Sequence, residues 1–126
     1  MDKIIINTPD APAPIGPYNQ SVLAGNLLFI SGQICIDPKT SELIKGDIKE
    51  ETTQVMKNLQ AILHEAGMHF NRVIKTTIFL TDMNQFSEVN EVYGSFFNGD
   101  YPARETVEVS ALPKFVNVEI SMIAMK

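Results

Sequence analysis

The chain has 126 residues, of which 44% are hydrophobic and 20% are charged, and its formal net charge is −5. This length suits one domain over residues 1–126 and is too short for two ordinary domains. The composition excludes a disordered chain, and the longest apolar runs have the length of strands and not of membrane spans. The start, MDKIIINTPD, lacks the features of a secretory signal, so we expect a cytoplasmic protein.

The charge and the cysteine content also narrow the partners. Lys and Arg are scattered singly along this acidic chain, whereas binding to nucleic acid usually needs a basic stripe. Cys35 is the only cysteine, which rules out an intrachain disulfide and a cysteine-based metal cage. We therefore expect no nucleic-acid partner, no membrane partner and no cysteine-based metal site.

The N-terminal third predicts three strands. Residues 4–7 form the first, and residues 8–20, with four prolines, form a surface loop. Two apolar runs then flank Gly25-Asn26, a pair that favours a hairpin turn.

Ser31-Gly32 interrupts the second of these apolar runs. A glycine inside a strand marks either a bulge or a place where another group approaches the backbone closely. The residues alone favour the bulge.

The clearest helix lies at residues 47–67, DIKEETTQVMKNLQAILHEAG. Asp47 and Glu50 match a capping box, and Gly67 is a natural stop. Apolar side chains at helical spacing predict its inner face: Val55, Leu59, Ile62, Leu63 and Ala66.

Residues 72–80, RVIKTTIFL, predict a buried strand because they are rich in β-branched side chains. A second helix follows, which Asp82 and Gln85 can cap. Its expected inner stripe consists of Phe86, Val89, Tyr93, Phe96 and Phe97.

The chain ends with two expected strands, residues 105–111 and 115–125, joined by a Leu-Pro turn. Alternation places Arg104 and Thr106 on the polar face of the first strand and Glu119 on the polar face of the second. A hairpin with polar face matched to polar face puts Thr106 opposite Glu119. Arg104 then lies on the diagonal, within side-chain reach of Glu119.

This pair has two readings. In the first, Arg104 and Glu119 form an ion pair on a solvated sheet face, which general physical principles favour. In the second, Arg104 holds a small anion. The same polar face of the hairpin also carries Phe115, Ile123 and Met125. Such a mixture suits a wet interface with another subunit, where ligand sites often form.

The element order is therefore β-β-β-α-β-α-β-β. It predicts an α+β domain in which two helices cover one face of a mixed sheet.

The segment PARETVEVSALPKFVNVEI, residues 102–120, resembles the signature of the Rid family of reactive-intermediate (enamine/imine) deaminases. The likeness continues through APAPIGPYNQSV, LLFISGQICIDPKTSEL and VIKTTIFLTDMNQFSEVNEVYGSFF. It covers nearly the whole chain in the family's order and spacing, which is more specific than any single motif.

The resemblance implies a chorismate-mutase-like subunit that forms a homotrimer with clefts between subunits. Members of the RidA type are 2-iminobutanoate/2-iminopropanoate deaminases. They hydrolyse 2-aminoacrylate and related imines to 2-oxo acids and ammonia without a metal or cofactor.

The resemblance also assigns roles to residues. Arg104 matches an arginine that holds the substrate carboxylate through two parallel hydrogen bonds. Glu119 matches a glutamate that orients a water molecule and accepts its proton. The expected substrate contacts besides Arg104 are Tyr18, Ser31, Gly32, the backbone N–H of Thr106 and, through a hydrogen bond to the loop that frames the cleft, Asn90.

Two positions depart from the family pattern. Thr106 stands where many members carry a cysteine, which excludes a thiol mechanism. Glu105 replaces a small residue, and alternation points its side chain away from Arg104.

Two other functions compete with the deaminase. One is a protein of the same fold that binds 2-oxo acids without turnover; the other is an RNA-acting translation inhibitor or ribonuclease. The acidic charge and the absence of a basic, aromatic-interleaved patch weigh against the second.

Overall fold

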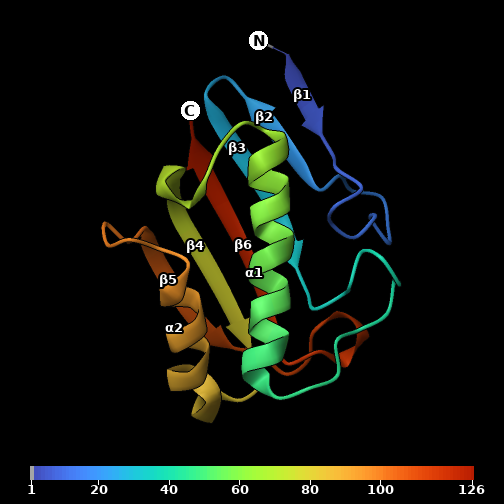
Figure 1. The fold of residues 1–126 in the computed structure, drawn as a ribbon, viewed down its shortest axis with the longest axis vertical. Coiled ribbons are helices and arrows are strands. Elements are labelled where there is room, and N and C mark those ends of the chain that lie inside the picture. The colour runs from blue at the N-terminus through green and yellow to red at the C-terminus, as the bar shows by residue number, and fades with distance from the viewer. Residues whose placement is uncertain (1) are drawn as a thin grey trace.

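The computed structural model describes residues 2–126 and has the predicted element order. Both helices lie on one face of a six-stranded sheet (Figure 1). Three short 3₁₀ turns complete the chain: Phe70–Arg72, Met83–Gln85 and Pro113–Phe115. The helices are α1, Ile48–Glu65, and α2, Phe86–Ser95, and the strands are β1 Lys3–Ile6, β2 Ser21–Ala24, β3 Leu27–Gln33, β4 Val73–Leu80, β5 Ala103–Glu108 and β6 Val118–Met125.

The hairpin of β2 and β3 turns at the predicted place. Ala24 pairs with Leu27 across the turn, and Gly25 has a φ of 63°, a conformation that glycine adopts without steric cost. The register of β3 against β6 shifts between Ile30 and Gln33, which confirms the bulge expected at Ser31-Gly32.

Helix α1 begins and ends as predicted. The side chain of Asp47 accepts a hydrogen bond from the Glu50 backbone N–H, and the Glu50 side chain accepts one from the Asp47 backbone N–H. Gly67 follows the helix with a φ of 73°. The inner face packs against the sheet at full burial, with Val55, Leu59, Ile62 and Leu63 inaccessible to solvent. Burying side chains of this size contributes about 1.5–3 kcal/mol each.

The expected hairpin of the last two strands is wrong. The sheet order is β1-β2-β3-β6-β4-β5, so β4 separates β5 from β6. β5 runs parallel to β4, and β6 runs antiparallel to both β4 and β3. The cause is α2, which connects β4 to β5 as a crossover and returns the chain in the same direction. Figure 1 shows β5 at the sheet edge beside α2.

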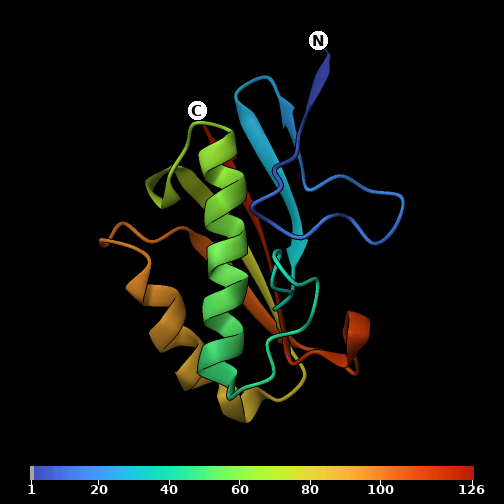
Figure 2. The same ribbon diagram turned by 45° about the vertical axis from the view of Figure 1, so that its right-hand side comes forward.

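The two faces of the sheet differ. Val118, Ile120 and Met122 of β6 are buried beneath the helices. The opposite face, called the open face below, has no covering layer within residues 2–126 (Figure 2). It exposes four large apolar side chains to between 40% and 44%: Ile5, Phe29, Val107 and Met125. No helix within residues 2–126 has the length and apolar character needed to cross a membrane.

Candidate active site

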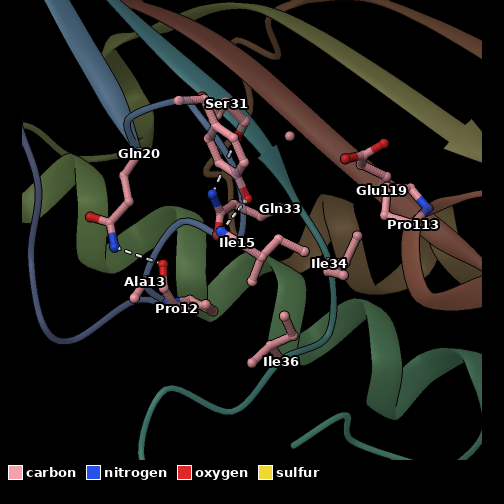
Figure 3. A pocket seen from close by; sticks show the side chains of 12 residues that line it. Pro12, Ala13, Ile15, Gln20, Ser31, Gln33, Ile34, Ile36, Pro113 and Glu119 are labelled. Atoms are coloured by element: carbon pink, nitrogen blue, oxygen red, sulfur yellow. Dashed lines mark hydrogen bonds between the residues drawn. The ribbon is translucent and has the colours of Figure 1, made fainter. Parts of the chain in front are cut away.

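A cavity of about 350 Å³ opens between the loop at residues 8–20, the end of β3 and the start of β6. Its walls are mainly apolar, and Figure 3 shows Glu119 and Pro113 across the cavity from Gln20 and Ala13. Four residues expected from sequence line it together: Tyr18, Ser31, Gly32 and Glu119. The remaining lining residues are Pro12, Ala13, Ile15, Gln20, Gln33, Ile34, Ile36 and Pro113.

The Glu119 side chain packs directly over Gly32. A Cβ atom on Gly32 would lie 2.5 Å from Glu119 Oε2 and 2.8 Å from the carboxyl carbon, closer than real Cβ contacts allow. The sequence left two explanations for Gly32, a bulge or the close approach of another group, and the structure has both. The bulge turns the Gly32 backbone toward the Glu119 carboxyl group.

Burial of Glu119 changes its acidity. Its side chain is half-buried, and desolvation raises the pKa of its carboxyl group above the ordinary value of 4.5. Burial disfavours the charged form, so the carboxylate binds a proton more readily than an exposed one. This is the direction in which proteins tune a carboxylate that must accept a proton near neutral pH.

Gln20 holds the loop of the cavity in place, and sequence analysis missed it. Its buried amide donates to the carbonyl oxygens of Thr8, Ala11 and Pro12 at 2.9–3.2 Å and accepts from the Thr8 backbone at 2.7 Å. The sequence gives little sign of this role beyond the position of Gln20 directly before β2. Hydrogen bonds from a side chain to the backbone of a distant loop leave no periodic pattern in the sequence.

Tyr18 and Ser31 shape the mouth of the cavity. The Tyr18 hydroxyl accepts a hydrogen bond from the Ile15 backbone at 3.2 Å, and the residue is 45% exposed. The Ser31 hydroxyl donates to the Asn19 carbonyl at 2.6 Å. Ser31 therefore ties the loop to β3, and its oxygen retains lone pairs for a ligand.

Arg104 lies elsewhere. It pairs with Thr76 of β4, which places it on the helix-covered face, and its guanidinium carbon lies 5.1 Å from the Tyr93 ring centre and 5.6 Å from that of Phe86. Aromatic faces attract a guanidinium at such distances, so α2 holds this side chain at the β5 edge.

Two expected substrate contacts accompany Arg104 and are absent from the cavity. Thr106 follows on the same face of β5, and its hydroxyl is buried without a hydrogen-bond partner within residues 2–126. Asn90 lies on α2 and is not among the residues that line the cavity within residues 2–126. We call Arg104, Thr106 and Asn90 the edge cluster.

The predicted proximity of Arg104 and Glu119 is therefore wrong for a single chain. Glu119 pairs with Phe79 and faces the open side, whereas Arg104 faces the helices from the far side of β4. The prediction placed both residues on one face because it paired the last two strands as a hairpin. In the structure β5 pairs with β4 instead, and Arg104 faces the helices.

Glu105 points away from Arg104, as alternation predicted. Its carboxylate lies 3.0 Å from Lys75 Nζ and accepts from the Thr77 hydroxyl at 3.2 Å. The hydrogen bond from Lys75 is the main cause that lowers the pKa of Glu105. This unusual residue is thus engaged on the open face and does not neutralise Arg104.

The other titratable groups suggest no additional centre. Burial raises the pKa of the Cys35 thiol to about 11, which keeps it protonated and unreactive. Within residues 2–126, no three His, Cys, Asp or Glu side chains gather in a way that could hold a metal ion.

Comparison with known proteins gives consistent results. The family model described as endoribonuclease L-PSP matches residues 8–126. A RutC family protein of Pyrococcus horikoshii is 57% identical over 124 residues, covering 98% of each chain. The mouse 2-iminobutanoate/2-iminopropanoate deaminase is 48% identical over 122 residues, covering 97% of this chain and 90% of the relative.

Solved structures agree in fold. A Yersinia pestis protein described as a member of the conserved Rid family has a TM-score of 0.97 and 48% identity, covering 99% of this chain and 100% of that one. The Escherichia coli protein TdcF, solved with bound serine, has a TM-score of 0.94 and 42% identity, covering 98% of both chains. The resemblance drawn from sequence extends through the whole fold.

Proposed function

Because the chain belongs to the endoribonuclease L-PSP family, which includes the Rid proteins, we propose that it is an imine/enamine deaminase. Its substrates are small 2-imino acids such as 2-aminoacrylate, 2-iminopropanoate and 2-iminobutanoate, and its products are 2-oxo acids and ammonia. The name of the mouse relative supports this activity. The observation that carries the proposal is Glu119, a carboxyl group with a raised pKa held at Gly32 inside the cavity.

We further propose that two copies of the chain complete each active site in a homotrimer. Glu119 lines the cavity of one subunit, and the edge cluster with Arg104 comes from its neighbour. The two parts lie on opposite faces of one sheet, so a single chain cannot bring them together. The exposed apolar side chains of the open face support a subunit interface there.

In the assembled site the Arg104 guanidinium binds the substrate carboxylate through two parallel hydrogen bonds. This binding fixes the C=N carbon relative to a water molecule next to Glu119, so positioning supplies much of the rate. The enamine first tautomerises to the imine. Glu119 accepts a proton from the water as the water oxygen bonds to the C=N carbon, and the imine nitrogen takes up a proton from solvent to give the carbinolamine. Glu119 then returns its proton to that nitrogen, the C–N bond breaks to release ammonia, and the hydroxyl group loses its proton to solvent to form the C=O of the 2-oxo acid.

The remaining residues shape the pocket around the ligand. Tyr18 forms a wall, the Ser31 hydroxyl and the Gly32 backbone contact the ligand, and the Thr106 N–H binds the carboxylate beside Arg104. An imine is already reactive toward water, so we expect no cofactor.

A coupled assay tests the activity. A dehydratase that releases 2-aminoacrylate is mixed with the purified protein, and the appearance of pyruvate and ammonia is followed. We expect acceleration that Arg104→Ala abolishes and that Arg72→Ala, at an exposed arginine before β4, leaves intact. The absence of acceleration by the wild type would overturn the deaminase proposal.

A binding protein without turnover is the second candidate, and the serine bound to TdcF favours it. Both functions need Arg104, but only hydrolysis needs a group that activates water. Glu119→Gln should therefore slow turnover on the order of 10²–10⁴-fold while 2-oxo acid binding, measured by calorimetry, changes little. Equal losses in binding and turnover would contradict the role of Glu119 as a base.

A further inference from the structure

Glu51 is a buried carboxylate that the proposed mechanism does not use. It lies in the first turn of α1, is 4% exposed and does not line the cavity. Its Oε2 accepts hydrogen bonds from the backbone N–H groups of Asn117 at 2.8 Å and Val118 at 3.1 Å. Its Oε1 accepts from the Asn117 side-chain amide at 2.9 Å. Burying a carboxylate is costly unless its oxygens are bound, and here both are.

These three donors belong to the residues that lead directly to Glu119. Val118 is the first residue of β6, and Glu119 follows it. The backbone N–H of Thr81, just after β4, donates to the Asn117 carbonyl at 3.1 Å. The start of β6 is therefore held between α1 on one side and the end of β4 on the other.

The segment before β6 explains why such a hold is needed. Lys114 and Phe115 both have positive φ angles, 56° and 57°, in a conformation that side chains disfavour. Such strain persists only when the surroundings fix the backbone on either side. Without the Glu51 contacts, the turn could relax and move the start of β6.

The Glu119 carboxylate lies directly over Gly32, in the space that a methyl group on Gly32 would enter. A shift of about 1 Å in a catalytic group costs up to the order of 10²-fold in rate. The backbone that carries Glu119 must therefore be held at least as firmly as the side chain itself.

We propose that Glu51 is a positioning residue: by accepting the N–H groups of Asn117 and Val118, it fixes the start of β6 so that the Glu119 carboxylate stays against Gly32. For its catalytic consequence the proposal rests on the deaminase function. For its structural consequence it does not, because the position of Glu119 can be measured without substrate.

Asn58 provides a matched control on the same helix. It is also buried, and its amide donates to the carbonyl oxygens of Ile34 and Ile36 at 3.0 Å each. Those two residues lie just after β3 and also line the cavity. Asn58→Ala therefore removes a buried polar group of α1 that bonds the cavity wall but does not bond Asn117 or Val118.

The experiment compares Glu51→Ala, Glu51→Gln, Glu51→Asp and Asn58→Ala with the wild type. Carbon-detected NMR follows the titration of the Glu119 carboxyl group, assigned with Glu119→Gln, and steady-state kinetics give kcat and KM. Glu51→Gln keeps an oxygen for both backbone donors, whereas Glu51→Asp keeps the charge but shortens the reach. Thermal unfolding identifies any variant that does not fold.

In Glu51→Ala we expect Glu119 to leave the cavity wall, so that its pKa falls toward the ordinary value while kcat drops on the order of 10²-fold at nearly constant KM. Glu51→Gln should keep the pKa of Glu119 and kcat near their wild-type values. Glu51→Asp should give values between those of the wild type and Glu51→Ala. Asn58→Ala should raise KM and leave the Glu119 titration unchanged.

An unchanged Glu119 titration and unchanged kcat in folded Glu51→Ala would overturn the proposal. If Glu51→Ala does not fold, the same result in Glu51→Asp would overturn it. A wild type without deaminase activity but with the expected titration changes would remove the proposed function and leave the positioning role standing.

Discussion

At the scale of single residues, Gly32 does more than form a bulge. Its missing side chain provides the space that the Glu119 carboxylate occupies. Gly32→Ala should therefore displace Glu119 and reduce kcat on the order of 10²-fold. Steady-state assays of imine hydrolysis, with a crystal structure of the variant, measure both effects.

Gly94→Ala is the matched control for this substitution. Gly94 lies in α2, and a Cβ added there would meet nothing within 4 Å. Alanine is favoured over glycine inside a helix, so this variant should gain about 0.5–1 kcal/mol in free energy of unfolding and keep its activity. Full activity in Gly32→Ala would contradict this prediction, because it would show that catalysis does not depend on the contact between the Glu119 carboxylate and Gly32.

At the scale of elements, the turn before β6 carries a cost in stability. Phe115 has a φ of 57° and is 88% exposed, so within one chain it loses conformational freedom and gains almost no packing. Phe115→Gly should raise the free energy of unfolding by about 0.5–1 kcal/mol, because the relief of backbone strain exceeds the entropy that glycine adds to the unfolded chain. Urea unfolding with an unchanged m-value measures the gain.

Lys39→Gly serves as the comparison for Phe115→Gly. Lys39 is exposed in a turn, and its φ is not positive. Glycine there should lower stability by a few tenths of a kcal/mol to about 1 kcal/mol. A loss of stability in Phe115→Gly would instead indicate that the ring is buried against another copy of the chain.

The elements themselves were largely predictable, and their pairing was not. The Asp47 and Glu50 cap and the Gly25-Asn26 turn are local signals, which the structure confirms. The partner of β5 depends on a non-local choice. Strand alternation fits a hairpin with β6 and a parallel pair with β4 equally well. A helix between two strands favours a parallel arrangement, as α2 gives for β4 and β5. It does not by itself make the strands neighbours, because β6 separates β3 from β4, which α1 connects.

At the scale of the whole molecule, four of the residues that line the cavity could be predicted from sequence, whereas the position of Arg104 could not. Family resemblance gathered Tyr18, Ser31, Gly32 and Glu119 correctly, because the cavity lies within one chain. Arg104 is separated from them by the sheet. Pairing rules within one chain cannot describe a contact between two chains. Gln20 and Glu51 were missed because their partners lie far away in sequence.

Burial of Glu119 lowers the stability of the native state at neutral pH. Its pKa is raised above 4.5 by desolvation, so the native state binds this proton more tightly than the unfolded chain does. The stabilising effect is fully present below about pH 4.5 and is lost as the pH rises through the raised value. Glu119→Gln should therefore be more stable than the wild type near pH 7, with a difference that grows with pH through this range.

Urea unfolding from pH 4 to pH 8 measures this difference, and Glu42→Gln, at an exposed side chain, controls for the change in net charge. A stability difference for Glu119→Gln that stays constant with pH would contradict the desolvated state of the carboxyl group.

The strongest test of the assembled site mixes two inactive proteins. If Arg104 and Glu119 of one site come from different copies, Arg104→Ala and Glu119→Gln chains can each supply what the other lacks. Every mixed trimer, whichever variant it holds twice, has one complete site, so isolated mixed trimers should recover roughly a third of the wild-type activity. Co-expression with two affinity tags, followed by isolation of mixed oligomers and the coupled assay, measures the recovery.

The double variant Arg104→Ala/Glu119→Gln provides the control for this mixture. Combined with Arg104→Ala, it forms mixed oligomers in which no site has an arginine, so activity should stay absent. Light scattering on the same samples establishes whether three copies assemble. Within one chain, Arg104 and Glu119 lie on opposite faces of the sheet, so the proposed site needs two chains. Mixed oligomers of the two single variants that remain inactive would therefore contradict a site shared between subunits.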